Sequence, residues 1–348
     1  MPKKSELADV TYVCGLLPAE LEEAIAGAGH KPYRARQVLR WVYQRGVYDF
    51  SGMSDLPLAM RQELAGRMAI NPLELSAKRQ ARDGSAKLVF RLPDAAVIEA
   101  VLMPYGERAT VCVSSQVGCA FRCAFCATGE LKLQRDLTPA EIIGQVLHAR
   151  AATEKRVTNV VFMGMGEPLA NYEAVLKAIT IIVNRACLNI GARHIAVSTC
   201  GLPQQIRRLA GEGPGVHLAV SLNAPDEDLR SRLMPVNRRH RLSEVIAAAR
   251  GYATRTGRKV SFEYCLLEGV NDSLAQAAAT ARLIGGFPCM VNLILYNQAR
   301  GDFRRPRPGV VAAFRRVLEE RQVEVAVRRS FGEEVAAACG QLAGSDRL

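Results

Sequence analysis

The second half of the chain alternates short β-type runs with amphipathic helical stretches, and this alternation restricts the fold more than any other feature. The strand-like runs lie at residues 109–116, 157–163, 194–199, 217–222, 259–267 and 290–296. Between them lie helix candidates such as residues 138–151, where Thr138 can cap the helix, Pro139 suits its first position and Glu141 completes a capping box. Six strand–helix repeats predict an α/β fold with a parallel sheet, either open or curled into a barrel. In both forms, ligands bind beyond the carboxyl ends of the strands.

The part of the chain before residue 80 is predicted to be helical. Apolar side chains at i, i+3, i+4 and i+7 indicate a helix with one buried face, and they are Ala35, Val38, Leu39 and Val42. Four arginines fall off that face and are expected to point outward: Arg34, Arg36, Arg40 and Arg45. The sequence leaves two interpretations of this basic surface open, an ordinary solvated helix face or a face that contacts phosphates.

A β-hairpin is predicted between the helical part and the alternating part. Its strands are expected at residues 87–92 and 97–103, with a turn at Pro93 and Asp94. These patterns divide the chain into a helical N-terminal domain over residues 1–80, a hairpin or linker over 81–108 and an α/β body over 109–348.

Charge and cysteine content restrict the class of partner and the compartment. The 348 residues include 46 lysines and arginines against 34 acidic residues, which gives a net charge of +12 and favours a polyanionic partner, RNA or DNA first. No apolar run approaches the ~18 residues that span a bilayer, and the first ten residues lack the apolar region of a signal peptide. A soluble, cytoplasmic protein without a membrane partner is therefore expected. In a reducing compartment, ten cysteines indicate metal ligation or thiol chemistry.

Three cysteines lie within eight residues, directly after the first strand of the alternating part. Cys119, Cys123 and Cys126 form a CxxxCxxC pattern, in which a compact loop can supply three ligands to an iron–sulfur cube and leave one iron for an outside ligand. A structural zinc site normally has four protein ligands, and no second CxxC pair or nearby histidine completes one here. Five cysteines in strand and helix contexts are interpreted as packing residues: Cys14, Cys187, Cys200, Cys265 and Cys289.

Small and polar residues follow the later strands, at the ends where ligands are expected. Residues 164–168 read Gly-Met-Gly-Glu-Pro; the glycines permit a close approach of the backbone to a ligand, and Glu167 can pair with a cation. Read alone, the same segment is also compatible with a simple turn. Ser198, Ser221 and Asn297 lie at or near later strand ends and are candidate contacts to a ribose or a carboxylate.

The cysteine triad resembles the signature of the radical S-adenosylmethionine (SAM) enzymes, in which SAM binds the open iron and is cleaved to a 5′-deoxyadenosyl radical. Four segments make the resemblance narrower, and it then covers nearly the whole chain: CVSSQVGC at 112–119, FMGMGEP at 162–168, LMPVN at 233–237 and ACGQL at 338–342. These segments look like the RlmN–Cfr family of RNA methylsynthases. The resemblance implies a partial (βα)6 barrel of the TIM type, preceded by a small N-terminal RNA-binding domain.

The resemblance also implies the reaction and its partners. RlmN types methylate carbon-2 of an adenosine in 23S ribosomal RNA, with an adenosine in certain tRNAs as a second substrate, and Cfr types methylate carbon-8 of the same ribosomal adenosine. The cofactors implied are a [4Fe–4S] cluster and two SAM molecules per turnover. The implied reductant is an electron donor such as flavodoxin or ferredoxin.

Individual residues take roles from the same resemblance. The triad would bind the cluster, and contacts to SAM would come from Gly166, Glu167, Ser198, Ser221, Leu222, Asn223 and Asn297. Cys339 would take a methyl group from one SAM as S-methylcysteine, and the radical from a second SAM would activate that methyl for addition to the base. Cys112 would then release the RNA through a transient disulfide with Cys339 that a reductant reopens, and Glu99 would accept a proton.

Two departures from the family pattern keep alternatives open. Asn223 stands where the family often has histidine, and residues 130–137 lack a glycine–aromatic pair that many RlmN members have. The second departure weakens the prediction that carbon-2 is methylated relative to the prediction of carbon-8, although carbon-2 stays favoured. The alternative without catalysis is an iron–sulfur or zinc protein that only binds RNA. That interpretation does not explain why Cys112 and Cys339 are present in addition to the triad. A tRNA methylthiotransferase is disfavoured because only Cys14 precedes Cys112, and that class needs a second triad upstream.

Overall fold

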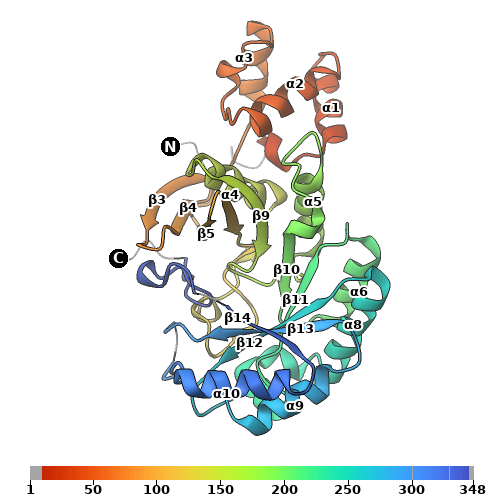
Figure 1. The fold of residues 1–348 in the computed structure, drawn as a ribbon. Coiled ribbons are helices and arrows are strands. Elements are labelled where there is room, and N and C mark those ends of the chain that lie inside the picture. The colour runs from red at the N-terminus through yellow and green to blue at the C-terminus, as the bar shows by residue number, and fades with distance from the viewer. Residues whose placement is uncertain (1–9, 300, 329, 345–348) are drawn as a thin grey trace.

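Ten strands form the main sheet of the structure, in the order β14-β13-β12-β11-β10-β9-β6-β5-β4-β3. The computed structural model describes residues 10–299, 301–328 and 330–344 (Figure 1). Seven neighbouring strands pair in parallel: β6 (Arg108–Cys112), β9 (Arg156–Phe162), β10 (Ile195–Thr199), β11 (His217–Ser221), β12 (Val260–Leu266), β13 (Cys289–Leu295) and β14 (Glu324–Arg328). Helices connect these strands and cover the outer face of the sheet. The fold is a partial (βα) barrel, which confirms the predicted fold class.

The first predicted strand is shorter than the sequence suggested. β6 ends at Cys112, and the chain then bends before Gln116–Val117 forms β7. β7 pairs antiparallel with β8 (Arg135–Asp136), and the segment between them carries the cysteine triad. This small sheet closes the base of the triad loop.

The predicted hairpin is part of the main sheet. β4 (Ala86–Arg91) and β5 (Val97–Tyr105) pair antiparallel, and β5 also pairs antiparallel with β6. β3 (Glu74–Gln80) adds a further strand at the edge, which the sequence did not predict. Most of its side chains are exposed, so it lacks the alternation of apolar and polar residues that indicates a strand.

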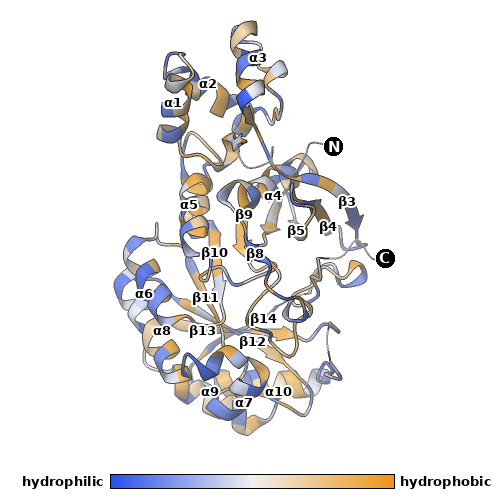
Figure 2. Ribbon diagram, turned by 180° about the vertical axis from the view of Figure 1, so that it is seen from behind, coloured by the Kyte–Doolittle hydropathy of each residue, from blue (hydrophilic) through white to orange (hydrophobic). Residues whose placement is uncertain are grey.

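The helices that follow the parallel strands pack against the apolar sheet. They are α4 (Pro139–Ala151), α5 (Tyr172–Val183), α6 (Pro203–Glu212), α7 (Glu227–Leu233), α8 (Leu242–Thr256), α9 (Leu274–Ile284) and α10 (Pro308–Glu319). Figure 2 shows mostly hydrophobic strands at the centre of the molecule and a largely hydrophilic α6 on its outside. Of the ten residues in α6, three are buried: Pro203, Ile206 and Leu209.

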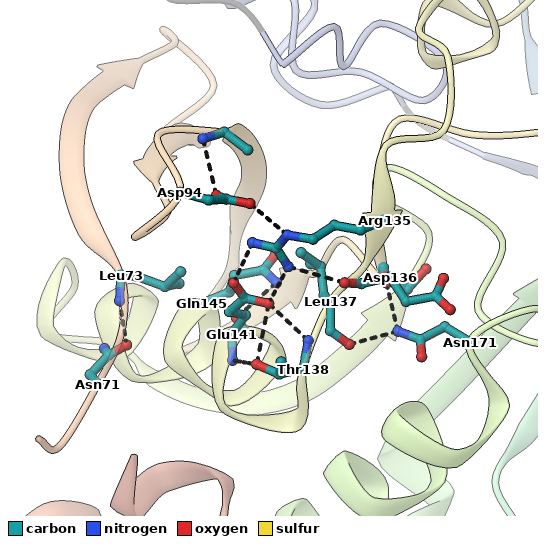
Figure 3. A network of polar contacts seen from close by, with 12 residues as sticks. Asn71, Leu73, Asp94, Arg135, Asp136, Leu137, Thr138, Glu141, Gln145 and Asn171 are labelled. Atoms are coloured by element: carbon teal, nitrogen blue, oxygen red, sulfur yellow. Dashed lines mark hydrogen bonds and ion pairs between the residues drawn. The ribbon is translucent and has the colours of Figure 1, made fainter. Parts of the chain in front are cut away.

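Helix α4 begins with the predicted capping box and an ion-pair network (Figure 3). The Thr138 hydroxyl accepts the Glu141 N–H at 3.2 Å, and the Glu141 carboxylate accepts the Thr138 N–H at 2.8 Å. The Arg135 guanidinium donates to Glu141 and also to Asp94 at 2.7 Å. Because Asp94 lies in the hairpin turn, this network ties the turn to the start of α4 and to the base of the triad loop.

Three helices lie near the N-terminus, and the segments that flank them pack against α4. The three helices are α1 (Pro18–Gly27), α2 (Arg34–Leu39), which continues as a π-helical turn over Arg40–Gln44, and α3 (Leu58–Arg67). The hydroxyl of Tyr48 donates to the Leu147 carbonyl at 2.9 Å, and Arg150 donates to the Tyr43 carbonyl at 2.8 Å. Helix α4 is consequently buried on nearly all sides, and its residues belong to one core with the N-terminal helices.

The predicted helix face of the N-terminal part is present. Ala35, Val38, Leu39 and Val42 are buried. Trp41 and Tyr43 are buried too, so the apolar surface extends beyond the predicted face. In the described part of the chain, no helix is long and apolar enough to cross a membrane.

Candidate active site

The triad loop leaves the sheet through a turn that requires glycine. Gly118 has φ 79°, and a side chain there would come within 2.2 Å of the Lys132 carbonyl oxygen. The Cys119 N–H donates to the Leu131 carbonyl at 3.3 Å. These contacts hold the three thiols on one short segment beyond the carboxyl end of β6.

The carboxyl ends of the parallel strands surround a cavity next to this loop, which we call the triad cavity. Its lining includes Cys123, Cys126, Gly166, Glu167, Ser198, Ser221, Asn223 and Cys339. Because the strands are parallel, residues far apart in the sequence converge on this one cavity.

The donors of the triad loop fit an iron–sulfur cluster better than a single metal ion. Among the described residues, no three histidine, cysteine or acidic side chains converge closely enough to hold one ion. Burial raises the pKa of the Cys119 thiol to about 12 and also raises the pKa of Cys126. Such thiols stay protonated without a cationic partner, whereas iron would favour their thiolate forms. Cys123 and Cys126 line the triad cavity and Cys119 lies on the same loop, so the triad fits a cluster with one open position.

Glu167 joins the end of β9 to the end of β10. Its carboxylate accepts the Leu169 N–H at 3.1 Å and the Cys200 N–H at 2.7 Å, and burial raises its pKa. The neighbouring Gly166 has φ 94°, and a side chain there would lie 2.5 Å from Cβ of Gln116. The glycine-rich segment is therefore more than a turn, because it brings backbone and carboxylate to the wall of the triad cavity.

Asn223 joins β11 to β12 at the same edge. Its φ of 57° is left-handed, a conformation that asparagine adopts more readily than most residues. The side-chain oxygen accepts the Cys265 N–H at 2.8 Å. Among the described residues, the amide nitrogen donates only to the sulfur of Met234, at 3.2 Å. That nitrogen is thus available to donate to a ligand in the cavity.

A second cavity adjoins the first, and we call it the Cys112 cavity. Its lining includes Cys112, Thr128, Asn297 and Leu342. Seven residues line both cavities: Cys126, Met163, Gly164, Ile294, Arg328, Cys339 and Gly340. Cys339 is exposed, whereas Cys112 is 8% exposed, and every cysteine of the chain is a free thiol. The C-terminal segment therefore places one exposed thiol where the two cavities meet.

The C-terminal segment is docked on the triad loop. The Ala127 N–H donates to the Gly340 carbonyl at 2.7 Å, and the Thr128 hydroxyl donates to the Leu342 carbonyl at 2.6 Å. Asn297 donates to the Cys339 carbonyl at 3.5 Å. These few contacts position Cys339 without burying its side chain.

Comparison with known proteins agrees with this geometry. Residues 113–281 match the model of the radical SAM superfamily, and residues 12–70 match the ribosomal RNA large subunit methyltransferase N-terminal domain. The chain is 45% identical to the dual-specificity RNA methyltransferase RlmN of Anaeromyxobacter dehalogenans, over 94% of this chain and 90% of the relative. It is 44% identical to the protein of that name from Pelobacter propionicus, over 99% and 97%. The chain belongs to the RlmN family of radical-SAM RNA methyltransferases.

A solved structure supports the same family at the level of the fold. A radical SAM methyltransferase from Sphaerobacter thermophilus is 47% identical, with a TM-score of 0.94, and the match covers 96% of this chain and all of that one. The RlmN-family fold therefore extends through the N-terminal helices, the hairpin and the barrel.

Five predicted site residues of this RlmN-family chain do not line the triad cavity: Cys112, Cys119, Glu99, Leu222 and Asn297. Cys112 lines the adjoining Cys112 cavity, and Cys119 lies on the triad loop outside both cavities. Leu222 is completely buried and lines neither cavity. Asn297 lines the Cys112 cavity, and its side-chain oxygen accepts from Arg305 at 2.9 Å. Glu99 is completely buried below the C-terminal segment, where its carboxylate accepts the Ala343 N–H at 2.9 Å.

Sequence reasoning missed a buried ion pair at Glu99. Lys87, on β4, is 4% exposed, and its ammonium group lies 3.2 Å from the Glu99 carboxylate. Val89 faces Glu99 in the β4–β5 register, so Lys87 is diagonal to it. The sequence did carry a signal for this ion pair: one strand of the predicted hairpin is largely apolar and carries one lysine, and the other carries a single glutamate.

Replacing Lys87 with methionine should lower the free energy of unfolding by about 3–5 kcal/mol, because Glu99 would be left as an unpaired buried charge. The midpoint of urea unfolding measures this loss. Lys78→Met, on the exposed edge strand β3, is the control and should change the free energy by less than about 1 kcal/mol. The double variant Lys87→Met, Glu99→Gln removes both charges and should recover most of the stability. An equal loss in the double variant would mean that packing, not charge, sets the effect.

Cys200 was predicted to be a packing residue, but the structure places it at the cavity. It lines the triad cavity, and its sulfur lies 3.9 Å from the sulfur of Cys123. Hydrogen bonding from Cys200 lowers the pKa of Cys123 and raises the pKa of Cys200. No spacing in the sequence links residues 123 and 200; only the adjacency of the strand ends does.

Arg230 was also missed, and it explains the LMPVN segment. The arginine is completely buried and donates to the carbonyls of Cys200 at 2.6 Å and Leu222 at 3.2 Å. Asn237, the last residue of that segment, accepts from Arg230 at 2.6 Å. The segment therefore holds the arginine that ties together the ends of β10 and β11.

Proposed function

We propose that this protein methylates carbon-2 of an adenosine in 23S ribosomal RNA through an S-methylcysteine on Cys339. The observation that carries the proposal is the position of Cys339, which lines both the triad cavity and the Cys112 cavity. A thiol at that junction can meet SAM on one side and the resolving thiol Cys112 on the other. The high identity to RlmN proteins over nearly the whole chain supports the same substrate.

Cys119, Cys123 and Cys126 would hold a [4Fe–4S] cluster, which supplies the electron that cleaves SAM to a 5′-deoxyadenosyl radical. The proposed SAM contacts are Gly166, Glu167, Ser198, Ser221, Leu222, Asn223 and Asn297. Five of these residues line the triad cavity, namely Gly166, Glu167, Ser198, Ser221 and Asn223, which supports their role. For Leu222 and Asn297, contact requires an adjustment of the strand ends that SAM would have to induce.

The residues of the chain would act in a fixed order on two SAM molecules. The Cys339 thiolate would take a methyl group from the first, and Cys339 would then hold that methyl where the radical derived from the second could remove a hydrogen atom from it. The methylene radical would add to the adenine carbon. The adduct would then lose the ring proton to Glu99 and one electron to the cluster, which the cleavage of SAM leaves oxidised by one electron. Glu99 lies below Ala343, so this step requires the C-terminal segment to shift.

Release of the product would use Cys112. Its thiolate attacks the Cys339 sulfur, the carbon–sulfur bond breaks, and the methylene carbon takes up a proton to become the methyl group. The two sulfurs are left as a disulfide, which a reductant reopens with two electrons. An electron donor such as flavodoxin or ferredoxin would serve the reductive steps.

Release should accelerate with pH if Cys112 is the resolving thiol. Burial, followed by the charge of nearby Cys339, raises the pKa of Cys112 to about 12, although Arg328 acts in the opposite direction. Below that pKa the thiolate fraction rises about tenfold per pH unit, so breakdown of the protein–RNA adduct should rise by about that factor per unit between pH 7 and 9. Single-turnover quenching on labelled RNA measures the rate. A rate that is flat over this range would argue against attack by a thiol of high pKa.

The N-terminal helices, within the proposed domain 1–80, would bind RNA. The exposed arginines Arg36, Arg40 and Arg45 support this role, and so does the match of residues 12–70 to a ribosomal RNA methyltransferase domain. We include an adenosine in certain tRNAs as a second substrate, because the relatives are named as dual-specificity enzymes. A cytoplasmic location fits these substrates.

Carbon-8 methylation of the same adenosine is the second candidate. It is favoured only by residues 130–137, which lack the glycine–aromatic pair of many RlmN members. Mass spectrometry of the adenosine from unmodified 23S RNA, SAM, reductant and reconstituted protein distinguishes the two. We expect 2-methyladenosine. A product of 8-methyladenosine would contradict the assignment of carbon-2 as the methylated atom. SAM cleavage without any methylated adenosine would contradict the assignment of 23S RNA as the substrate.

A further inference from the structure

A basic groove lies at the opposite edge of the barrel from the proposed active site. It occupies about 1190 Å³ and its lining includes six lysines and arginines: Arg108, Arg150, Lys155, Arg156, Arg193 and Arg258. His194 adds a further titratable group, and two acidic residues line the groove, Glu107 and Glu154. Positive charge therefore clearly exceeds negative charge across this concave surface.

The groove is built from the amino ends of the parallel strands. Arg108 begins β6 and Arg156 begins β9, while Arg193 lies two residues before β10 and Arg258 two residues before β12. At about 3.3 Å per residue, the seven residues of β9 place this edge roughly 23 Å from the carboxyl edge that forms the triad cavity. The groove is thus a separate feature of the surface.

The cations of the groove keep their charge uncompensated. Within the part of the chain that the structure describes, none of the six forms an ion pair with a carboxylate. Their hydrogen bonds go to neutral acceptors, such as that of Lys155 to the Gly106 carbonyl at 2.6 Å. Four of the six side chains are exposed, and without carboxylate partners they give the hollow a positive potential that favours an anion.

The groove is continuous with the N-terminal helices. Arg150, in the last turn of α4, donates to the Tyr43 carbonyl at 2.8 Å, next to the exposed Arg45. Lys177 of α5 pairs with Glu20 of α1 at 2.7 Å. Figure 1 shows α5 and the loop after it reaching the N-terminal helices. A polyanion that lies on those helices would therefore also pass the groove.

We propose that this groove binds the phosphate backbone of the RNA substrate at a distance from the modified base. The groove is wide and its cations are spread over the starts of several strands, which suits a chain of phosphates better than one enclosed small anion. The inference rests on the proposed RNA substrate and deepens it. It implies that the enzyme recognises a folded RNA that extends well beyond the target loop.

The test compares two triple variants that each remove three positive charges. The groove variant is Arg108→Gln, Arg156→Gln, Arg193→Gln, which spares Arg150 because that side chain bonds to the N-terminal helices. The control is Arg255→Gln, Arg282→Gln, Arg321→Gln, on α8, on α9 and just after α10, none of which lines the groove or either cavity. Both are assayed as reconstituted holoenzyme, with SAM cleavage as a check that the fold and cofactor site are intact.

Binding is measured on a domain-sized fragment of 23S RNA and on a short hairpin that carries only the target loop, over a range of salt concentrations. With the long RNA, the groove variant should bind about 10- to 100-fold more weakly near 0.1 M salt, and its log–log salt slope should be smaller by about 2 to 3. The hairpin should bind both variants equally, and the methylation rate at saturating long RNA should stay within about twofold of wild type.

Two results would overturn the groove proposal. One is equal binding and equal salt slope for the groove and control variants on the long RNA. The other is displacement of the long RNA from wild type, but not from the groove variant, by millimolar inorganic phosphate, which would identify a small-anion site. Failure of the proposed function is distinct, because wild-type protein would then bind RNA without methylating it, and the two variants could still be compared by binding.

Discussion

Replacing Cys339 with alanine is expected to abolish methyl transfer to RNA while SAM is still cleaved to 5′-deoxyadenosine. Cys339 is an exposed thiol that lines both cavities, and alanine has no atom that can carry the methyl group. Because the variant lacks the atom through which the methyl group is transferred, we expect the rate of methylation to fall by at least about a thousandfold. Nucleoside mass spectrometry and the yield of 5′-deoxyadenosine, measured in one reaction, test both halves of this result.

Two further variants give this experiment its controls. Cys289→Ala removes a thiol that lines neither cavity and should leave both products unchanged. Cys123→Ala removes a proposed cluster ligand and should eliminate both. Methylated adenosine from Cys339→Ala at the wild-type rate would show that the methyl group never passes through this residue.

The strands and helices with strong local patterns were predictable from the sequence. All six predicted strand regions contain a strand, and the capping box of α4 forms as Thr138 and Glu141 indicated. β3 was not predictable, because an edge strand with exposed side chains carries no apolar alternation. β14 is five residues long and follows a helix at the end of the chain, so its assignment depends on pairing with β13.

The site was predictable only where chemistry is concentrated along the chain. The sequence alone indicated the triad, because its three cysteines lie within eight residues, and the glycine-rich segment, because its glycines closely precede a glutamate. Cys200, Arg230 and Lys87 act through contacts between strand ends or across strands, and nothing in their own sequence surroundings indicates a partner. Cys200 and Arg230 became visible only when the sheet order placed β10 and β11 side by side, and Lys87 only when β4 paired with β5.

The groove and the active site together suggest how the charge of the chain is used. A net charge of +12 from the sequence left open whether the excess is simply solvated. Six groove cations at one edge of the barrel, and exposed arginines on the adjoining helices, place much of that excess on one continuous surface. A folded RNA held there would still have to deliver one base to the opposite edge, which favours a target in a flexible or extruded loop.

Cys112→Ala is expected to trap the protein on its RNA. Three cysteines line the Cys112 cavity, namely Cys112, Cys126 and Cys339. Cys126 is a proposed cluster ligand and Cys339 is the proposed methyl carrier, so Cys112 is the thiol left to attack the Cys339 sulfur. Without it, the carbon–sulfur bond to the base should persist, and the adduct should approach one RNA per active protein.

Denaturing gels with labelled RNA measure this adduct, and mass spectrometry of the digested complex locates it. We expect turnover to fall at least about a hundredfold, with the modified nucleotide attached to the peptide that contains Cys339. Cys187→Ala removes a buried thiol outside both cavities and should turn over normally. The double variant Cys112→Ala, Cys339→Ala should give no adduct, since the residue that would be linked is missing. Normal turnover by Cys112→Ala, with no adduct at any time, would mean that another group releases the product and that the burial of Cys112 is only structural.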